Sequence, residues 1–254
     1  MMKPPLVSII TPTFNRPDFL NLVLKCVNTQ SYKNIEWIIL DDSEKPDLNF
    51  QDKTIENVKY IHQKNRLSVG EKRNLLIKAS AGKYIVQFDD DDFYGAKYIE
   101  TLMNLMEEKN VDFVLMAGFF CSHLDKKVLG YYRTRHKKGM AYKFSREGIV
   151  PVTLEDLNIP MIHLCYGWSY IFKREIWEKN PFKDINVFED RTFLIDAVKN
   201  KYKVIYHEDQ EGIASHSVHK KSSSVCLPQF VIPNFAIKKI FKEEAELVQK
   251  FFDV

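Results

Sequence analysis

The fold of this chain is decided by the stretch Tyr84-Ile85-Val86-Gln87-Phe88-Asp89-Asp90-Asp91-Asp92, where an apolar, β-prone run ends in four carboxylates. Val86 and Phe88 suit a sheet interior, but four adjacent aspartates do not, so the run must emerge at a strand end. Like charges this close raise one another's pKa unless a cation joins them. Hard divalent ions prefer oxygen ligands, often one or two carboxylates with substrate phosphates. The stretch therefore predicts a strand-end metal site for a phosphorylated substrate, and the alternative is a solvated acidic turn.

A calcium-binding helix-loop-helix is excluded by the residues that follow. If Asp89 is the first position of the loop, Glu100 falls at the twelfth, as that motif requires. The fifth and sixth positions are then Phe93 and Tyr94, where the motif needs an oxygen ligand and a turn-forming glycine.

The composition favours one globular protein with a large core. The chain has 254 residues, 45% of them hydrophobic, and a net charge of +3 that is too small to indicate a nucleic-acid partner. Its four cysteines are far apart, which predicts reduced, buried thiols and no zinc site: Cys26, Cys121, Cys165 and Cys226. No apolar run reaches the roughly 18 residues of a membrane span, and residues 1–5 form no signal peptide. We expect a cytoplasmic protein without a membrane span, or a chain trimmed of an anchor.

The first half of the chain alternates strands and helices. We expect strands at residues 6–11, 35–40, 58–62, 84–88 and 113–116, with helices between most of them. Ser68-Val69-Gly70-Glu71 matches the capping box, so a helix should begin near Val69 and end near Gly82. This alternation predicts a Rossmann-like, mainly parallel α/β sheet flanked by helices, whose ligands bind beyond the carboxyl ends of its strands. Three strands end there in polar residues: at Pro12-Thr13-Phe14, at Asp41-Asp42 and at the four aspartates.

The second half is less regular, but we expect it to belong to the same single domain, residues 1–254. Residues 117–165 should form strands and loops over the site, followed by a strand at 168–172 and a short helix near 174–178. Phe188-Glu189-Asp190-Arg191 should open another helix, before a strand at 203–207 and a polar loop at 216–224. We assign about 1–116 to nucleotide binding, about 117–232 to the acceptor and catalytic half, and about 233–254 to an amphipathic helix. That helix should pack on this domain or on a second copy of the chain, as a homodimer.

With these residues in place, the chain resembles the family 2 glycosyltransferases, which are inverting enzymes of the GT-A fold. The resemblance spans most of residues 6–219, and the order and spacing of its segments are more specific than any segment alone. It is strongest at Val7-Ser8-Ile9-Ile10-Thr11-Pro12-Thr13-Phe14-Asn15, Ile39-Leu40-Asp41-Asp42-Ser43, Gly70 with Arg73-Asn74, Ala81-Gly82-Lys83-Tyr84-Ile85, Asp89-Asp90-Asp91-Asp92 and Phe188-Glu189-Asp190.

The resemblance implies a role for each matching position. Asp89 and Asp91 match the D-x-D motif, with Asp91 as the metal ligand and Asp89 on the ribose side, and Asp190 matches the catalytic base. His216 and His219 lie in a region that supplies a histidine to the metal or diphosphate in some relatives. Both histidines remain candidates for this role, and His219 is slightly favoured. The remaining expected substrate-binding residues are Pro12, Thr13, Phe14 and Asp42 for the base, Arg73 and Asn74 beside the nucleotide, and Asp90, Glu189 and Trp168. Purely structural roles remain possible for several of these residues: a solvated surface charge for Arg73, helix capping for Glu189-Asp190, and a core position for Trp168.

The implied activity is transfer of a sugar from a nucleotide-diphosphate donor, by family habit a UDP-sugar, to a hydroxyl of a carbohydrate or glycoconjugate acceptor. A divalent ion, Mn²⁺ or Mg²⁺, would neutralise the leaving diphosphate, and one base suffices for a single inverting displacement. Two alternatives stay open. A sugar-nucleotide pyrophosphorylase would need a Gly-rich loop after the first strand, where residues 12–16 contain no glycine. A non-catalytic carbohydrate- or nucleotide-binding module would bind without turnover. The chain contains neither G-x-G-x-x-G nor a Walker loop, which disfavours dinucleotide and P-loop enzymes.

Overall fold

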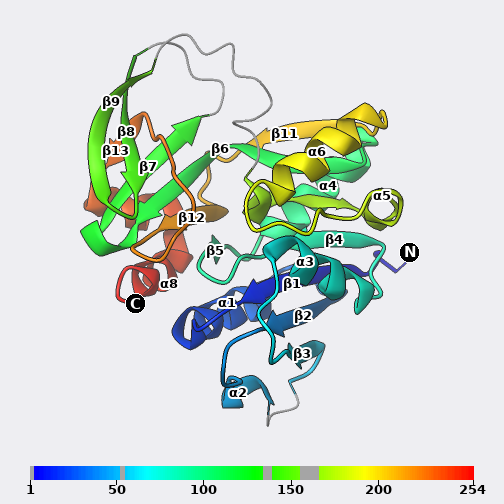
Figure 1. The fold of residues 1–254 in the computed structure, drawn as a ribbon. Coiled ribbons are helices and arrows are strands. Elements are labelled where there is room, and N and C mark those ends of the chain that lie inside the picture. Colours follow the sequence, from blue (N-terminus) through cyan, green and yellow to red (C-terminus); the bar gives the residue numbers. More distant parts are fainter. Residues whose placement is uncertain (1–2, 52–54, 134–138, 155–165) are drawn as a thin grey trace.

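The protein is described by a computed structural model that covers residues 3–51, 55–133, 139–154 and 166–254 (Figure 1). Its strands are β1 (Val7–Thr13), β2 (Ile35–Asp41), β3 (Val58–His62), β4 (Tyr84–Gln87), β5 (Phe93–Tyr94), β6 (Phe113–His123), β7 (Val128–Arg133), β8 (Gly139–Ser145), β9 (Gly148–Leu154), β10 (Ile171–Lys173), β11 (Val204–Glu208), β12 (Ala214–Val218) and β13 (Phe230–Ile232). Its α-helices are α1 (Pro17–Thr29), α2 (Leu48–Gln51), α3 (Val69–Lys78), α4 (Tyr98–Lys109), α5 (Arg174–Lys179), α6 (Glu189–Lys199), α7 (Ile237–Phe241) and α8 (Ala245–Phe251).

One large sheet connects the two halves of the chain. Its path runs β13-β7-β6-β10-β4-β1-β2-β3, with β11 and β12 both parallel to β6 and β5 antiparallel to β12. Strands β4, β1, β2 and β3 are parallel to one another, as predicted, and Thr13 lies opposite Asp41 in register. The carboxyl ends of these strands therefore meet at one edge of the sheet. The short β10 is antiparallel to both β4 and β6 and joins the parallel half to the rest.

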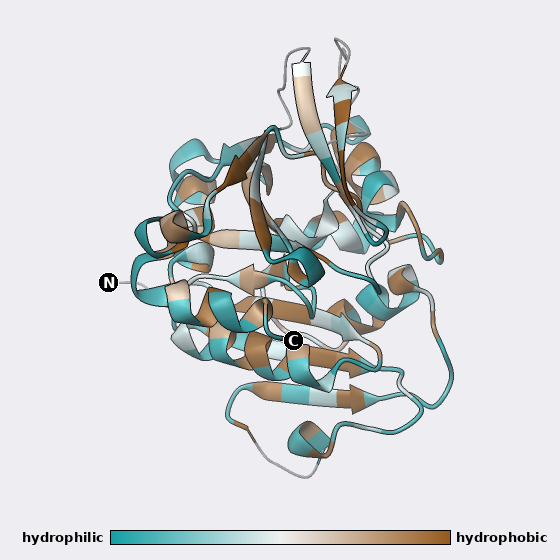
Figure 2. Ribbon diagram, turned by 90° about the vertical axis from the view of Figure 1, so that its left-hand side faces the viewer, coloured by the Kyte–Doolittle hydropathy of each residue, from teal (hydrophilic) through white to brown (hydrophobic). Residues whose placement is uncertain are grey.

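Apolar side chains cover both faces of the sheet. Neighbouring residues Ile9 and Ile10 of β1 point into opposite clusters, as the alternation of a strand requires. The cluster around Ile9 includes residues of α1, α4, α7 and α8, whereas the cluster around Ile10 includes residues of α3, α5 and α6. Figure 2 shows the hydrophobic colouring along the central strands. Strands buried on both faces explain the nearly continuous apolar sequences of β1 and β2.

The start of α3 confirms the predicted capping box. Ser68 Oγ accepts a hydrogen bond from the Glu71 N–H at 3.0 Å. The expected helix end at Gly82 is wrong, since α3 ends at Lys78. A Cβ at Gly82 would lie 2.3 Å from Ser8 Oγ, so glycine serves the close approach of the chain to β1.

The second half corrects three expectations. His216 lies on strand β12 and not in a polar loop, and Trp168 lies in a 3₁₀ turn, Gly167–Ser169, before β10. Within the tail, α7 and α8 replace the single helix expected over 233–254, because the chain leaves the helical conformation at Lys242, with φ 51° and ψ −121°. Residues 139–154 form the hairpin β8–β9, whereas 134–138 and 155–165, which we also expected over the site, lie outside the described residues.

The apolar side of the tail packs on this domain. Phe241 lies 5.6 Å from Phe93 and 5.4 Å from Phe120 between ring centroids, and Phe251 is also buried. Figure 1 shows α8 beside α1. Cys26, Cys121 and Cys226 are buried free thiols, as expected, while Cys165 falls outside the described part of the chain. Of the helices that the structure describes, none has the length and apolar character needed to cross a membrane.

Candidate active site

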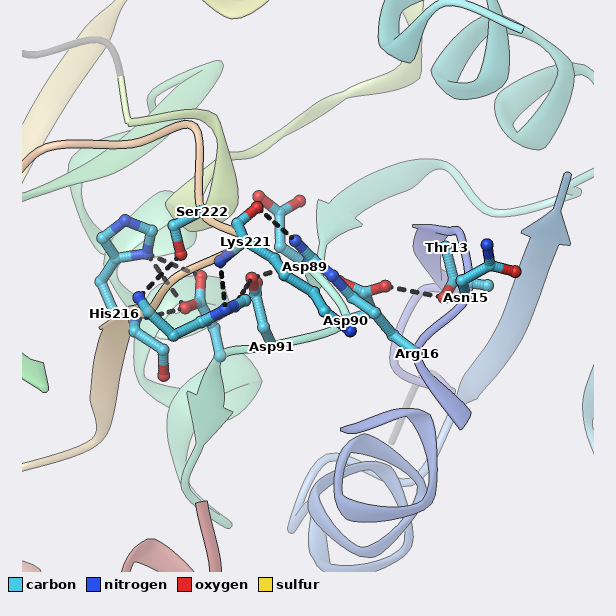
Figure 3. A network of polar contacts seen from close by, with 12 residues as sticks. Thr13, Asn15, Arg16, Asp89, Asp90, Asp91, His216, Lys221 and Ser222 are labelled. Carbon is cyan, nitrogen blue, oxygen red and sulfur yellow. Dashed lines mark hydrogen bonds and ion pairs between the residues drawn. The ribbon is translucent and has the colours of Figure 1, made fainter. Parts of the chain in front are cut away.

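The four aspartates form an acid turn, Asp89 to Asp92, that links β4 to β5 at the carboxyl edge of the sheet (Figure 3). Asp90, Asp91 and Asp92 are buried, and Asp89 is partly exposed. The turn is anchored by the Asp89 N–H, which donates to the Tyr94 hydroxyl at 2.8 Å. Buried carboxylates require compensating partners; Asp90 and Asp91 share one, whereas Asp89 and Asp92 each have their own.

Arg16 neutralises the centre of the acid turn. Its Nη1 donates to Asp90 Oδ1 at 2.6 Å and to Asp91 Oδ2 at 2.7 Å. Asp90 Oδ2 also accepts from the Thr13 hydroxyl at 2.7 Å. Burial and the charge of Asp91 raise the pKa of Asp90 to about 6, although Arg16 and Thr13 favour its ionised form. Burial alone would also raise the pKa of Asp91, but Arg16 and His219 hold that pKa below its ordinary value.

Asp91 and His219 are the pair best placed to hold a divalent ion. His219 Nε2 lies 2.9 Å from Asp91 Oδ2, close to the roughly 3 Å that separates adjacent ligands around an octahedral ion with bonds of about 2.1 Å. The His219 ring stacks on Phe19 with centroids 5.2 Å apart. Its Nδ1 accepts from the Lys221 N–H at 3.2 Å, so Nε2 carries the ring proton and donates to Asp91 Oδ2. That proton must move to Nδ1, with loss of the Lys221 contact, before Nε2 can bind an ion. Among the described residues, no group of three or more His, Cys, Asp or Glu side chains is arranged to hold a metal. The donor set therefore fits an ion that takes its other ligands from a substrate.

His216 has a different position, although the sequence did not distinguish it from His219. Its Nδ1 lies 2.9 Å from Asp92 Oδ2, and its ring stacks on Trp168 with an interplanar angle of 10°. Asp92 Oδ1 also accepts from the Ser217 N–H at 2.6 Å. Burial raises the pKa of Asp92; it would lower that of His216, but the carboxylate of Asp92 holds the His216 pKa above its ordinary value. This buried pair fixes the acid turn to β12.

Arg73 joins the acid turn to the start of α6. Its Nη1 donates to Glu189 Oε1 at 2.7 Å, and its Nη2 donates to Asp89 Oδ1 at 3.3 Å. Arg73 is buried, and burial would lower its pKa, but the charges of Glu189, Asp89 and Asp190 raise the pKa above its ordinary value. The two carboxylate groups, 89–92 and 189–190, therefore face one region.

Asp190 is held by two backbone donors. Its Oδ2 accepts from the Gly167 N–H at 2.9 Å, and its Oδ1 accepts from the Arg191 N–H at 2.6 Å. A Cβ at Gly167 would lie 2.8 Å from both Arg73 Nη1 and Asp190 Cβ, so only glycine allows this approach. Burial raises the pKa of Asp190, against the lowering effect of Arg73 and the two N–H donors. A carboxylate with a raised pKa and unused lone pairs is suited to accept a proton.

Asp42 lies at the end of β2 on the side of the sheet that faces α3. It is buried, and its oxygens accept from Arg66 Nη1 at 2.5 Å, Lys72 Nζ at 2.9 Å and the Leu67 N–H at 2.9 Å. The Arg66 guanidinium lies 3.4 Å from the centroid of the Phe14 ring, as a flat group stacked on its face. Lys72 also donates to the Thr13 carbonyl oxygen at 3.2 Å, which ties this group to Pro12-Thr13-Phe14.

A pocket of about 360 Å³ lies beside Arg16, between the ends of β1 and β2 and the start of α1. Of the expected nucleotide-binding residues, only Thr13 lines it. Its other lining residues are Asn15, Arg16, Pro17, Leu20, Asp41, Ser43, Lys45, Pro46, Asp47 and Leu48.

Two predicted site residues have structural partners instead of an open position. The Asn74 side chain bonds the Phe182 backbone N–H and carbonyl and accepts from Trp177 Nε1 at 2.8 Å. Trp168 is buried, and its ring meets Phe119 edge-on.

Comparison with known proteins places the chain in a family. The model of the family described as "Glycosyl transferase family 2" matches residues 8–156. The chain belongs to this family. An uncharacterized glycosyltransferase of Haemophilus influenzae is 33% identical and covers 96% of this chain and 90% of its own length. An uncharacterized glycosyltransferase of Rickettsia conorii is 36% identical over a match that covers 42% of this chain and 18% of the relative's length. The matched part therefore spans about a fifth of that relative.

Two solved structures of other glycosyltransferases share the architecture of this family member. S. aureus TarS 1–349 in complex with UDP-GlcNAc has a TM-score of 0.64 at 18% identity, over 96% of this chain and 70% of its own. A mannosyltransferase of Pyrobaculum calidifontis in complex with GDP-Man and Mn²⁺ has a TM-score of 0.58 at 15% identity, over 87% and 59%. These similarities confirm the predicted GT-A fold.

Several residues of this glycosyltransferase site did not emerge from the sequence. The sequence shows Arg16 only as part of a loop without glycine, although a basic residue directly before the first helix could indicate an acidic partner. Its partners lie 74 and 75 residues away, so no local pattern reveals them. Lys72, Arg66 and Gly167 were missed for the same reason.

Proposed function

We propose that this chain is an inverting glycosyltransferase that moves a sugar from a UDP-sugar to a hydroxyl of a carbohydrate or glycoconjugate. The observation that carries the proposal is the bridge from Asp89 through Arg73 to Glu189. It brings a carboxylate with a raised pKa, Asp190, to the region that also contains the acid turn. The choice of UDP is supported by the fold shared with TarS, whose structures contain UDP and UDP-GlcNAc.

On the donor side, we assign Asp91 and His219 as the residues that hold Mn²⁺ or Mg²⁺. A divalent ion bound there supplies positive charge that neutralises the leaving diphosphate. The geometry of Asp91 Oδ2 and His219 Nε2 supports this assignment, as does the fact that a cationic group, Arg16, already occupies the acid turn. Asp89, which faces Arg73 and is partly exposed, is assigned to the ribose side.

We assign the nucleobase to the face of Phe14, beside Pro12, Thr13 and Asp42. The position of the Arg66 guanidinium supports this, because it lies 3.4 Å from the centroid of that ring, where a planar base could take its place. A base bound there would replace Arg66 on the ring or lie against it.

In the proposed reaction, Asp190 accepts the proton of the acceptor hydroxyl as its oxygen bonds to the anomeric carbon. The bond from that carbon to the donor phosphate oxygen breaks in the same displacement, and the nucleoside diphosphate leaves. The Gly167 and Arg191 N–H groups keep the Asp190 carboxylate in place, and Arg73 remains paired with Glu189. Inversion follows from a single attack on the face opposite the leaving group, without a covalent intermediate.

The test is UDP release from a panel of UDP-sugars with Mn²⁺ and a panel of carbohydrate acceptors. Asp190→Asn should lower turnover by about 10²–10⁴-fold, the usual contribution of a general base. Asp91→Asn or excess chelator should also abolish turnover. Asp253→Asn is the matched control, since this exposed carboxylate pairs only with Lys127 at the surface. Full turnover in Asp190→Asn or in chelator, or UDP-sugar binding without any turnover, would refute the proposal.

A further inference from the structure

Arg16 is bonded to two carboxylates of the acid turn, although the proposed reaction assigns it no role. Its Nη1 donates to Asp90 and Asp91, and its Nη2 donates to the Lys221 carbonyl oxygen at 3.2 Å (Figure 3). The side chain is 20% exposed, so its head group is enclosed but remains in reach of solvent. Burial would lower the pKa of Arg16, but Asp91, Asp90 and Asp89 raise that pKa above its ordinary value, which keeps the guanidinium charged.

The backbone aims Arg16 at these carboxylates. Asn15 has a left-handed conformation with φ 53°, which asparagine adopts more readily than most residues. Its N–H donates to Ser43 Oγ at 2.7 Å, and α1 begins immediately after Arg16, at Pro17. Arg16 is thus fixed between a turn bonded to the β2 end and the first turn of a helix.

Asp91 Oδ2 is saturated in this arrangement. A carboxylate oxygen has about two lone-pair sites, and here one accepts from Arg16 Nη1 and the other faces His219 Nε2. The same oxygen and the same imidazole nitrogen are the donors assigned to the divalent ion. Arg16 Nη1 must therefore leave Asp91 Oδ2, and the hydrogen bond from His219 Nε2 must be given up, before a cation can be bound by both atoms.

We propose that Arg16 is a built-in counter-cation that occupies the metal position of the free protein and moves to the donor diphosphate when the donor and the divalent ion bind together. This inference rests on the proposed function. A guanidinium that leaves two carboxylates without a new anion loses charge-assisted hydrogen bonds, whereas a diphosphate offers it a two-pronged replacement. Arg16 thus opposes binding of the ion alone and favours binding of the ion with the nucleotide.

The contact to Lys221 extends this coupling to the chain after β12. Residues 219–222 contain His219, whose N–H donates to Ser222 Oγ at 3.0 Å, and they are connected to Arg16 through the Lys221 carbonyl. Movement of Arg16 therefore removes one of the contacts that hold the segment presenting His219, while the Lys220 N–H keeps its bond to Asp125 Oδ2 at 2.9 Å.

The experiment measures Mn²⁺ affinity by electron paramagnetic resonance of the free ion, with and without UDP, for the whole chain. In wild type, UDP should strengthen Mn²⁺ binding strongly. In Arg16→Met, Mn²⁺ without UDP should bind about tenfold more tightly or better, because hydrogen bonds to a charged group no longer compete. The strengthening by UDP should shrink in the same variant, and calorimetry should show an equal loss in the effect of Mn²⁺ on UDP.

Two further variants complete the test. Arg16→Lys keeps the charge without the two-pronged geometry, so it should bind Mn²⁺ without UDP more tightly than wild type but less tightly than Arg16→Met; it provides the answer if Arg16→Met does not fold. Arg133→Met removes an exposed arginine paired with Glu208 outside the site and should change nothing. Unchanged or weaker Mn²⁺ binding without UDP in Arg16→Met and Arg16→Lys would overturn the role of Arg16. Absence of Mn²⁺ binding in every protein, even with UDP, would refute the proposed metal site itself.

Discussion

Asp89, Asp90, Asp91 and Asp92 are adjacent in sequence, yet their carboxylates have different partners. Asp89 pairs with Arg73, Asp90 and Asp91 with Arg16, and Asp92 with His216. A run of like charges predicts that cations must be near, but not which ones, because the partners come from the residue before α1, from α3 and from β12. The sequence therefore predicted a charged cluster at this strand end without assigning its partners.

The raised pKa of Asp190 predicts a pH dependence of turnover. In the proposed reaction the ionised carboxylate of Asp190 is the active form, so kcat should fall as the pH falls through this pKa, by about tenfold per pH unit below it. Because burial raises the pKa, the fall should begin above the ordinary aspartate value of about 3.9. Turnover measured from about pH 4 to about pH 8, with thermal unfolding recorded at each pH, tests this.

Asp190→Glu should shift the midpoint of that fall, because the longer side chain loses the fixed N–H donors. Asp253→Asn should leave the midpoint unchanged. The assignment of Asp190 fails if the midpoint is identical in Asp190→Glu, or if stable protein shows constant kcat across the range.

At the scale of elements, strands and helices with clear periodicity were predictable. The expected strand at 58–62 coincides with β3, and the capping box placed the start of α3. Sequence reasoning failed where tertiary contacts decide: β10 has only three residues and exists because it lies between β4 and β6. In the tail, the apolar spacing suited one helix, but the chain turns at Lys242, which has a positive φ, and both Phe241 and Phe251 are buried.

The tail offers a matched pair of phenylalanines for a stability test. Phe251 is 2% exposed and Phe235 is 87% exposed. Phe251→Ala should reduce the free energy of unfolding by about 3–5 kcal/mol, as expected for truncation of a buried phenylalanine. Phe235→Ala should change it by less than about 0.5 kcal/mol. Urea titrations of both variants decide this, and similar losses in the two would show that the tail does not pack as described.

At the scale of the whole molecule, one sheet joins the two halves, and a few charged side chains cross between them at the candidate site. Arg73 on α3 reaches Glu189 on α6, and Asp92 beside β5 reaches His216 on β12. The rule that parallel strands end at one edge predicted the first half of this assembly. The second half followed no such rule, because β11 and β12 return to pair with the same long β6.

Because the site is assembled from both halves, its ligands should stabilise the entire fold. A ligand at about 100 times its Kd adds about 2.7 kcal/mol, which for a chain of this size raises Tm by about 5–10 °C. Mn²⁺ with UDP should produce this rise, and Mn²⁺ alone should produce much less. Differential scanning calorimetry should show the rise abolished in Asp91→Asn. If UDP in the presence of a chelator raised Tm as much as UDP with Mn²⁺, the ion and the nucleotide would not share one site.

The Phe19 ring lies between the candidate site and the hydrophobic core. It stacks on His219, and its centroid lies 6.5 Å from that of Phe251. A single aromatic layer thus separates the last helix from an imidazole that faces Asp91. Substitutions near residue 250 should therefore shift the position of the His219 ring, and with it the proposed cation affinity, without altering any polar group of the site. Apolar variation in the last helix thus becomes a route by which evolution could adjust the site.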